Sequence, residues 1–531
     1  MVAAAVLTSC PRPQTPPRRP ALLLTAGLAL LLAVGVELVP VVGADLVAQQ
    51  WWASWAATSG GRPVDLGWFG GSPAVSYSLL APGLLAVLGP PLAGVLGTTV
   101  GATATTALLL RAGAVRPRAA GVASAVLWAA DQLSGRTTFA LGAAVGLLAL
   151  LAVRGPGGRA SRRVTTAVPA VLTGALSPVA AVFLGLAAAA WWLAPPARGS
   201  ARPTGGAALL LTGAAAPLLG MVVLGAAGGP MTGSTHQMTS AVAAAGVVAL
   251  LVGREQPLLR VGALLTALAL LVCWLVPEPV GSNTTRLVLL FAVPVLVGTV
   301  RRRPAVVLAS AALVVWLLPP VLPADLAPRH PADRTTPLLR ELADRAPVGR
   351  VEVVPLADHQ DALLGERVPL ARGWNRQLDV ARNPLFYDGT LAPDTYLAWL
   401  RARGVSFVAL STHRPDWAAR AEATLVRDGV PGLTPVWSDR HWTLYAVAGS
   451  AFVRGPADLV SSDRRAVTVA ARGAGTVAVA LDWDARLSVS GPACLAPAQD
   501  GTVLLHTTGS GSVVLTSAWW PAGHCEDPPG G

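Results

Sequence analysis

The sequence predicts a polytopic α-helical membrane protein of about eleven transmembrane helices, followed by an extracytoplasmic α/β domain and a small β-sandwich-like domain. Three observations predict this class. Hydrophobic residues make up 53% of the chain and charged residues 13%, which lies outside the range of ordinary soluble domains. Long apolar runs fill the chain as far as residue 318. After residue 319, shorter segments alternate in the manner of soluble strands and helices.

The first apolar run, residues 21–42, has the length of a membrane-spanning helix. It ends in VGA-D, which resembles the cleavage site of a signal peptide, but its length favours a retained anchor. The runs that follow bring the total to about eleven spans. They cover approximately residues 79–110, 119–131, 137–153, 164–176, 179–194, 204–227, 237–253, 258–276, 286–300 and 304–318.

Some of these runs are too short for a straight span of about 20 residues. Pairs of runs turn at DQLSGR (131–136) and at SP (177–178), with no long polar loop between them. Polar turns at membrane depth are stable only inside protein or beside water. We therefore expect the helix bundle to enclose a cavity that opens to the outer face.

The positive charge of the chain predicts its orientation in the membrane. The chain has a net charge of +12 and contains no lysine, which excludes sites built on a P-loop, Schiff-base or SxxK lysine. Arginines cluster before the first run and in alternate connections: Arg12, Arg18, Arg19, Arg111, Arg116, Arg118, Arg154, Arg159, Arg162, Arg163, Arg198, Arg202, Arg254, Arg260, Arg301, Arg302 and Arg303. This positive-inside pattern predicts a cell-membrane protein with a cytoplasmic N-terminus and extracytoplasmic C-terminal domains, and no nucleic-acid partner.

The membrane part of the chain has three predicted segments. Residues 1–20 form a cytoplasmic N-terminal tail, and residues 21–318 form the multi-pass transmembrane domain, whose first outer loop is 43–78. The Pro-rich stretch 319–334 reads as a linker to the outside.

Two domains are predicted after the linker. An α/β domain over 335–450 follows from a strand in GRVEVVPL, a helix–glycine–strand pattern in TYLAWLRARGVSFVALS, a helix in DWAARAEATLVRDGV and a hairpin in PVWSDRHWTLYAV. Period-two alternation with Gly-rich turns predicts a β-rich domain over 451–531.

The cysteines and histidines bear on disulfides and metals. Cys494 and Cys525 share the outer β-rich domain, where oxidising conditions favour a disulfide. Cys10 lies in the cytoplasmic tail and Cys273 in a span. The chain has no CxxC pair, and its seven histidines show no ligand spacing, so we expect no metal site and no cofactor.

The first outer loop opens with a lone acid, Asp45, followed by a segment rich in tryptophan. On a helix Asp45, Gln49 and Trp52 share one face, and Trp51 and Trp55 lie on another. The tryptophans fit the interfacial aromatic belt of a membrane-surface helix. A carboxylate at the mouth of an expected cavity is a functional candidate, but Asp is also a favoured helix N-cap.

The loop combines Asp45 directly after the first span, an outer-face helix to about residue 57, the loop GWFGGSP (67–73) and YSLLAP (77–82). This combination resembles the first outer loop of the GT-C superfamily of membrane glycosyltransferases. Leu46 stands where the common form of that superfamily has a second acid. Nearly the whole chain also resembles a family of uncharacterised actinobacterial multi-pass membrane proteins, whose members are sometimes labelled transporters. That second resemblance rests on SGRTTFALG (134–142), LSPVAAVFLGLAAAAW (176–191), PVGSNTTRL (279–287) and VPLARGWNRQLD (368–379).

The GT-C resemblance implies a transferase that takes a sugar from a polyprenyl-phosphate donor in the lipid of the outer face. The acceptor would be an envelope glycan or glycolipid. Inverting transfer needs a base for the acceptor hydroxyl, a role for Asp45 or its substitute Asp65, and cations for the leaving phosphate. Arg136 and Arg286 lie at predicted outer-face ends of spans, where each binds a phosphate or snorkels to the interface. Further candidates for binding the donor or substrate are Gln49, Trp68, Tyr77 and Asn283.

A second group of candidates lies in the outer α/β domain. ARGWNRQLD brings together Arg372, Trp374, Arg376 and Gln377, residue types that recognise sugars and anionic lipids or that pin one domain onto another. A transporter or lipid-handling permease and a non-catalytic protein of the same fold are the alternative functions. The spans contain few acids and the outer domain is large, which favours the transferase.

Overall fold

The computed structural model describes residues 18–196, 204–225, 228–231, 233–301, 303–317, 326–329 and 332–525. The chain forms two compact units. The first, the helical unit, comprises residues 1–53 and 77–328, and the second, the outer unit, comprises residues 54–76 and 329–531. The predicted N-terminal tail and most of the predicted linker lie outside the described residues.

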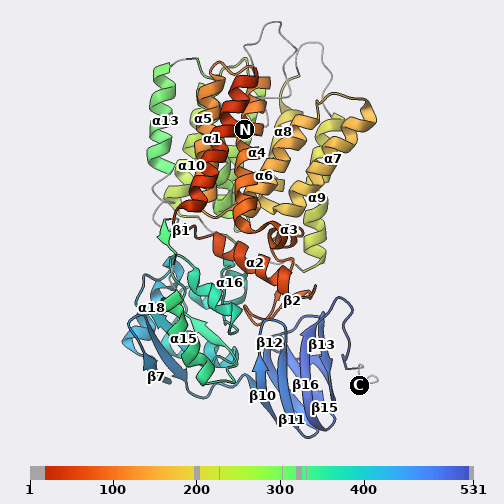
Figure 1. Ribbon diagram of the computed structural model, residues 1–531, viewed down its shortest axis with the longest axis vertical. Coiled ribbons are helices and arrows are strands. Elements are labelled where there is room, and N and C mark those ends of the chain that lie inside the picture. The colour runs from red at the N-terminus through yellow and green to blue at the C-terminus, as the bar shows by residue number, and fades with distance from the viewer. Residues whose placement is uncertain are drawn as a thin grey trace. The chain divides into compact units, whose positions relative to one another are not determined.

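The helical unit is a bundle in which α1 packs on α4 and α5, α4 on α6, α6 on α7, α7 on α9, and α12 on α5 (Figure 1). A short ladder, β1 (Val41–Val42) with β4 (Ala327–Pro328), joins the ends of this unit. The helices are α1 (Arg18–Leu38), α3 (Ala81–Leu88), α4 (Pro90–Arg111), α5 (Pro117–Leu133), α6 (Thr137–Ala152), α7 (Arg159–Leu176), α8 (Pro178–Leu193), α9 (Thr204–Val223), α10 (Thr235–Leu251), α11 (Pro257–Leu275), α12 (Arg286–Thr299) and α13 (Arg303–Leu317).

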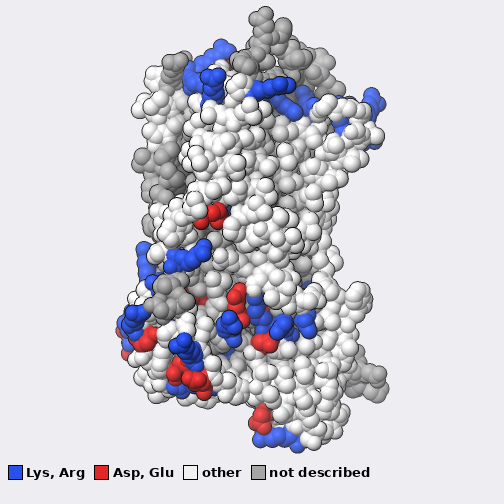
Figure 2. Space-filling model, viewed as in Figure 1, with Lys and Arg blue, Asp and Glu red and all other residues white. Residues whose placement is uncertain are grey.

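Within the described residues, five helices are long and apolar enough to cross a membrane. They are Arg19–Leu38, Pro90–Arg111, Thr204–Val223, Pro257–Leu275 and Gly281–Thr299. Figure 2 shows that the visible face of the helical unit is almost free of charge along its length, with arginines gathered at one end. Exposed leucine and valine side chains such as Leu23, Leu31 and Val223 are typical of a lipid-facing surface. The prediction of a membrane protein is confirmed at this level, and the count of eleven spans stays a prediction.

One predicted run is two helices. The run 79–110 divides into α3 and α4 at Gly89, which has a φ of 75° and precedes Pro90 and Pro91. The positive φ ends α3, and the proline ring starts α4 because proline at the first helical position needs no hydrogen-bond donor. The shorter runs match α5, α6, α7 and α8, and their turns fall at the predicted DQLSGR and SP segments.

The outer unit contains a four-stranded mixed sheet in the order β5-β6-β8-β7. β5 pairs with β6 in parallel, and the other pairs are antiparallel. Each segment predicted as helix or strand in this region has that structure, and Gly404 ends α17 with a φ of 63°. The elements are α15 (Ala332–Asp344), β5 (Val351–Val353), α16 (Arg376–Arg382), α17 (Pro393–Ala402), β6 (Phe407–Ser411), α18 (Arg420–Asp428), β7 (Leu433–Ser438) and β8 (Trp442–Val447).

The C-terminal part of the outer unit is β-rich, as predicted. Two antiparallel four-stranded sheets, β10-β11-β16-β13 and β14-β15-β12-β9, share one hydrophobic core to which Val467, Val477 and Val513 contribute. The strands are β9 (Val453–Arg454), β10 (Ala457–Ser462), β11 (Val467–Arg472), β12 (Gly475–Asp482), β13 (Leu487–Ser490), β14 (Ala493–Pro497), β15 (Thr502–Thr507) and β16 (Ser510–Ser517). Cys494 and Cys525 are joined by a disulfide.

Much of the predicted first outer loop belongs to the outer unit. Residues 54–76 form the hairpin of β2 (Val64–Asp65) and β3 (Ser72–Pro73), which is grouped with the C-terminal domains. Val64 exchanges hydrogen bonds with the Ser517 hydroxyl, and the Asp482 amide donates to Gly70. Residues 54–76 of the predicted outer loop 43–78 therefore group with the C-terminal domains, and only the two ends of the loop belong to the helical unit.

The tryptophans after Asp45 do not form an exposed belt. They lie on α2 (Leu46–Thr58), and the relative exposure of Trp51, Trp52 and Trp55 is 0%, 4% and 1%. The Trp55 ring lies under the Arg464 guanidinium, with 5.2 Å between the ring centre and Cζ. The interpretation of these residues as membrane-interface anchors is wrong, because an interfacial ring has to reach the headgroup region.

Candidate functional site

Asp45 lies between two arginines of the helical unit, a group that we call the Asp45 cluster. Its Oδ2 atom accepts hydrogen bonds from Arg286 Nη2 at 3.1 Å and from Arg136 Nε at 3.3 Å. The Asp45 side chain is 30% exposed, while those of Arg136 and Arg286 are 17% and 10% exposed. One carboxylate thus holds two largely buried guanidiniums, and the cluster carries one net positive charge.

Two turns that interlock set the position of Asp45. The Asp45 amide donates to the Ser134 carbonyl at 3.3 Å. A Cβ atom on Gly43 would lie 2.3 Å from the Leu133 carbonyl oxygen, and one on Gly135 would lie 2.3 Å from the Leu46 nitrogen. Because glycine has no Cβ, the turn before α2 packs directly on the turn between α5 and α6. Arg136 follows Gly135 and comes beside Asp45 in this way.

Arg286 comes from a third segment. It begins α12, directly after the short 3-10 helix η2 (Gly281–Thr285). Its Cζ lies 5.1 Å from the centre of the Phe139 ring, and its charge acts on the nearby phenol of Tyr77. Burial raises the pKa of Tyr77 although the charge of Arg286 acts to lower it, so the phenol keeps its proton. Tyr77 thus places a neutral hydroxyl near the two cations of the Asp45 cluster.

Further polar groups line the same part of the helical unit. Thr138 donates a hydrogen bond to Gln49, one turn after Asp45 on α2. Asn283 lies in η2, one turn before Arg286, and is buried. The structure therefore brings Asp45, Arg136, Arg286 and Tyr77 together, and it places Gln49 on α2, which follows Asp45, and Asn283 on η2, which precedes Arg286.

Sequence reasoning missed Asp131, a second acid of this region. Its side chain is 4% exposed, and its Oδ1 atom lies 3.6 Å from Arg136 Nη1. It belongs to the last turn of α5, in the DQLSGR segment that was interpreted only as a turn. An ionisable residue at the end of an apolar run is itself a signal for a functional position.

Asp65 and Trp68 lie in the interior of the outer unit. Asp65 is fully buried and accepts a hydrogen bond from Arg464 Nη2 at 2.7 Å and from the Gly67 amide at 2.9 Å. The Trp68 indole is also fully buried and donates to the Ala362 carbonyl at 3.2 Å. These contacts hold residues 54–76 in place, and the roles of Asp65 as a substitute base and of Trp68 as a donor-binding group stay predictions.

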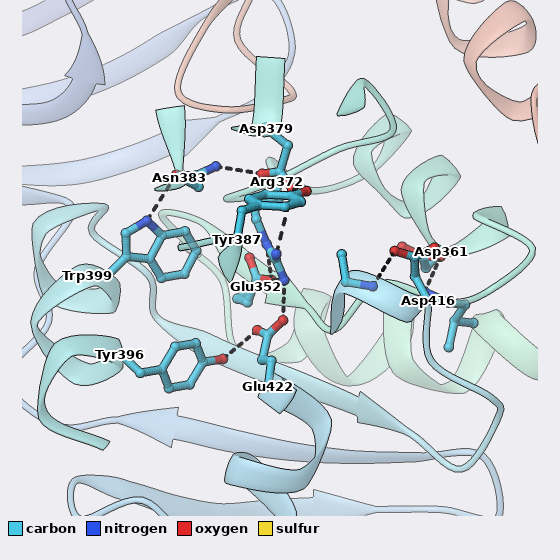
Figure 3. A network of polar contacts seen from close by, with 12 residues as sticks. Glu352, Asp361, Arg372, Asp379, Asn383, Tyr387, Tyr396, Trp399, Asp416 and Glu422 are labelled. Atoms are coloured by element: carbon cyan, nitrogen blue, oxygen red, sulfur yellow. Dashed lines mark hydrogen bonds and ion pairs between the residues drawn. The ribbon is translucent and has the colours of Figure 1, made fainter. Parts of the chain in front are cut away.

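Arg372 also lies in the interior of the outer unit. Its guanidinium donates to Glu352 at 2.8 Å and to Glu422, and it lies 3.7 Å from Asp379, a group that we call the Arg372 network (Figure 3). Its side chain is 2% exposed, which excludes contact with a sugar or a lipid in this conformation.

Burial and neighbouring charges shift the pKa values of the Arg372 network. Burial raises the pKa of Glu352 well above its ordinary value and raises that of Glu422, although Arg372 acts to lower both. Burial alone would lower the pKa of Arg372, but the carboxylates of Glu352, Glu422 and Asp379 together raise it well above its ordinary value. The arginine therefore stays charged.

The rest of the ARGWNRQLD segment forms a compact stack. The Trp374 ring lies on the His359 ring with 3.4 Å between their centres. Arg376 is bound by Asp416 at 2.7 Å, and its Cζ lies 5.0 Å from the rings of both Trp374 and Trp417. The adjoining pocket, lined by His359, Trp374, Arg376 and their neighbours, has about 20 Å³ of free volume, enough for a single water molecule. Gln377 is half-buried on α16.

Among the residues that the structure describes, no group of three or more His, Cys, Asp or Glu side chains is placed to hold a metal ion. No model of a known protein family matches the chain, and a search of curated proteins finds no match.

Proposed function

We propose that the protein is an integral membrane glycosyltransferase that transfers a sugar from a polyprenyl-phosphate donor to an envelope glycan or glycolipid on the outer face of the membrane. The observation that carries the proposal is the shared oxygen of Asp45, which accepts from guanidiniums of two segments about 150 residues apart in the chain. A carboxylate and a pair of cations are the two groups that inverting transfer requires, as a base and as a partner for the leaving phosphate.

Asp45 and the phosphate of a donor compete for the same two arginines. A sugar-phosphate diester carries one negative charge, as Asp45 does, and a guanidinium binds phosphate through two parallel N–H groups. A phosphate that takes over Arg136 and Arg286 leaves Asp45 without its partners. The ion pairs of the ligand-free protein then hold the base inactive until the donor arrives.

The reaction balances with these groups alone. The acceptor oxygen forms a bond to the anomeric carbon, and the bond from that carbon to the phosphate oxygen breaks. Asp45 takes the proton of the acceptor hydroxyl. The electron pair of the broken bond leaves with the polyprenyl phosphate, whose added negative charge is stabilised by Arg136, Arg286 and the hydroxyl of Tyr77.

Of the other sequence-based candidates, Gln49 and Asn283 stay in the proposal because they lie on α2, which directly follows Asp45, and on η2, which directly precedes Arg286. The residues of the outer unit do not enter it as donor ligands. Their side chains are buried or already engaged with protein partners.

A deletion strain tests the proposal. We expect the strain to lose an envelope glycan and to accumulate its lipid-linked sugar, and the wild-type gene to reverse both changes. Arg286→Gln should fail to restore the glycan, because it removes a cation of the Asp45 cluster. Arg472→Gln is the matched control, since Arg472 pairs with Asp458 on the exposed surface of the β-rich domain. Unchanged glycans and lipid-linked sugars in the deletion strain would show that the proposal is wrong.

A further inference from the structure

Asp131 has a buried carboxylate oxygen without a partner. Its Oδ1 atom faces Arg136 Nη1 at 3.6 Å, whereas its Oδ2 atom is buried and has no hydrogen bond among the residues that the structure describes. Leaving a buried charged acceptor unsatisfied is costly, and native proteins rarely do so. A donor that is not part of the described chain is therefore expected at this oxygen: a water molecule or a ligand.

The position of Asp131 beside Arg136 favours a ligand over a water molecule as this donor. Arg136 bridges the two acids, with Nε on Asp45 and Nη1 on Asp131. Under the proposed function, the donor phosphate takes the place of Asp45 on this guanidinium. A group bonded to Asp131 then lies one guanidinium away from the phosphate, which is the distance scale of a sugar attached to it.

The charges around Asp131 limit the kind of chemical group that can bind to it. Asp45, Asp131, Arg136 and Arg286 together are neutral. When a singly charged phosphate displaces Asp45 from the arginines, Asp131 still faces Arg136 and keeps that side of the site balanced. A second anion at Asp131 would be repelled, and a neutral hydroxyl is the donor that fits a carboxylate oxygen without adding charge.

We propose that Asp131 accepts a hydrogen bond from a hydroxyl of the donor sugar, and that it makes the site selective for a glycosylated lipid phosphate over the bare lipid phosphate. The inference rests on the proposed function and adds a residue that recognises the sugar of the donor rather than its phosphate. Such a residue favours the loaded donor over the product lipid phosphate, which competes for the same arginines.

The test measures binding by the full-length protein in lipid nanodiscs. The probes are a short-chain polyprenyl phosphate and its glycosylated forms, each with one hexose or one pentose. The wild type should bind at least one glycosylated form about tenfold to a hundredfold more tightly than the bare phosphate, the value of one hydrogen bond to a charged group. Asp131→Asn and Asp131→Ala should abolish most of this preference. Because they remove a negative charge beside Arg136, they should keep or increase the affinity for the bare phosphate.

Glu37→Gln is the matched control. Glu37 is an acid of the same unit whose carboxylate accepts a hydrogen bond from Gln132, the neighbour of Asp131, at 2.6 Å. Its replacement should keep the wild-type preference. A set of deoxy-sugar probes gives a second measurement on the unaltered protein: removal of one particular hydroxyl should lower affinity by the same factor as Asp131→Asn.

The outcomes separate the two proposals. A preference that persists in both Asp131 variants, or a wild type that tolerates every deoxy probe, would overturn the inference and leave water as the partner of Asp131. Failure of the wild type to bind either kind of lipid, or an Arg286→Gln variant that binds both as tightly as the wild type, would instead contradict the proposed function.

Discussion

Gly43 and Gly135 determine how closely Asp45 approaches Arg136. Both stand where a Cβ atom would come within 2.3 Å of backbone atoms of the opposite turn. Backbone cannot move aside as a flexible side chain can, so an added methyl group has to separate the turns. The geometry of the Asp45 cluster thus depends on two residues that have no functional group of their own.

Gly43→Ala should therefore misplace Asp45 and destabilise the helical unit by about 1–3 kcal/mol. Complementation of the deletion strain at matched expression measures the functional loss, and thermal unfolding measures the structural one. Gly27→Ala is the control, because no heavy atom lies within 4 Å of its added Cβ. Normal complementation by Gly43→Ala would show that the interlocked turns do not position the base.

Buried acids of the outer unit predict a pH dependence of stability. Burial raises the pKa of Asp361 well above its ordinary value of 3.8. A group whose pKa is raised by folding stabilises the native state fully below the unfolded pKa, and this stability is lost as the pH rises through the folded pKa. Glu352 should contribute to the same loss of stability with rising pH, because burial also raises its pKa.

We expect the unfolding temperature of the outer unit to fall as the pH rises above the ordinary pKa of a carboxylic acid, and to fall less in Asp361→Asn. Thermal unfolding of the full-length protein at increasing pH measures both slopes. Asp388→Asn is the control: hydrogen bonds from Thr390 lower the pKa of this exposed acid, so its contribution changes only in more acidic solution. A slope that is the same in Asp361→Asn and the wild type would contradict the assignment.

At the scale of elements, the disulfide joins β14 to the segment that follows β16. Cys494 lies on β14, and the Cys525 amide donates to the Leu495 carbonyl at 2.8 Å. The bond closes a loop of 31 residues in a domain with its own small core. A crosslink of this kind stabilises mainly by restricting the unfolded chain.

Cys494→Ala with Cys525→Ala should cost the β-rich domain roughly 2–4 kcal/mol of unfolding free energy. Denaturant unfolding of the exported protein measures the loss, with Cys273→Ala as the control because Cys273 is a free cysteine. Mass spectrometry of the unreduced protein should show the crosslinked peptide. Free thiols at both positions after export would refute the prediction.

The strands and helices of the outer unit could be predicted because their signals are local. Alternation, Gly404 and the turn residues between β7 and β8 lie within the segments that they define. The packing of residues 54–76 on the C-terminal domains could not be predicted, because their partners Arg464, Asp482 and Ser517 follow hundreds of residues later in the sequence. A loop next to two spans gives no sequence sign of pairing with a distant domain.

The candidate site was predictable in part for the same reason. Asp45, Arg136 and Arg286 each stand at the end of an apolar run, and a charge at such a position needs a partner or water. Asp131 was missed because it falls in a segment with the polar appearance of a turn. The burial of Arg372 could not be predicted because its three acidic partners, Glu352, Asp379 and Glu422, are spread over 70 residues of the sequence.

At the scale of the whole molecule, the arginine distribution predicts one orientation in the membrane. The N-terminus should be cytoplasmic and everything after Pro319 extracytoplasmic, which requires an odd number of spans. Reporter fusions after residue 335 test this, with fusions after residue 115 as the cytoplasmic reference. The fusion after 335 should be active only with a reporter that folds outside the cytoplasm. Activity confined to the cytoplasmic reporter would contradict the orientation.

The central claim is that Asp45 is the base of a transfer reaction whose donor binds Arg136 and Arg286. The most direct measurement is product formation and donor binding by Asp45→Asn in the same nanodisc preparation. Asparagine caps a helix about as well as aspartate, so α2 is preserved in the variant. We expect turnover to fall about 100-fold or more while donor affinity is kept or increased, because the competing carboxylate is gone. Turnover close to that of the wild type would contradict the claim and leave Asp45 as a helix cap and ion-pair partner.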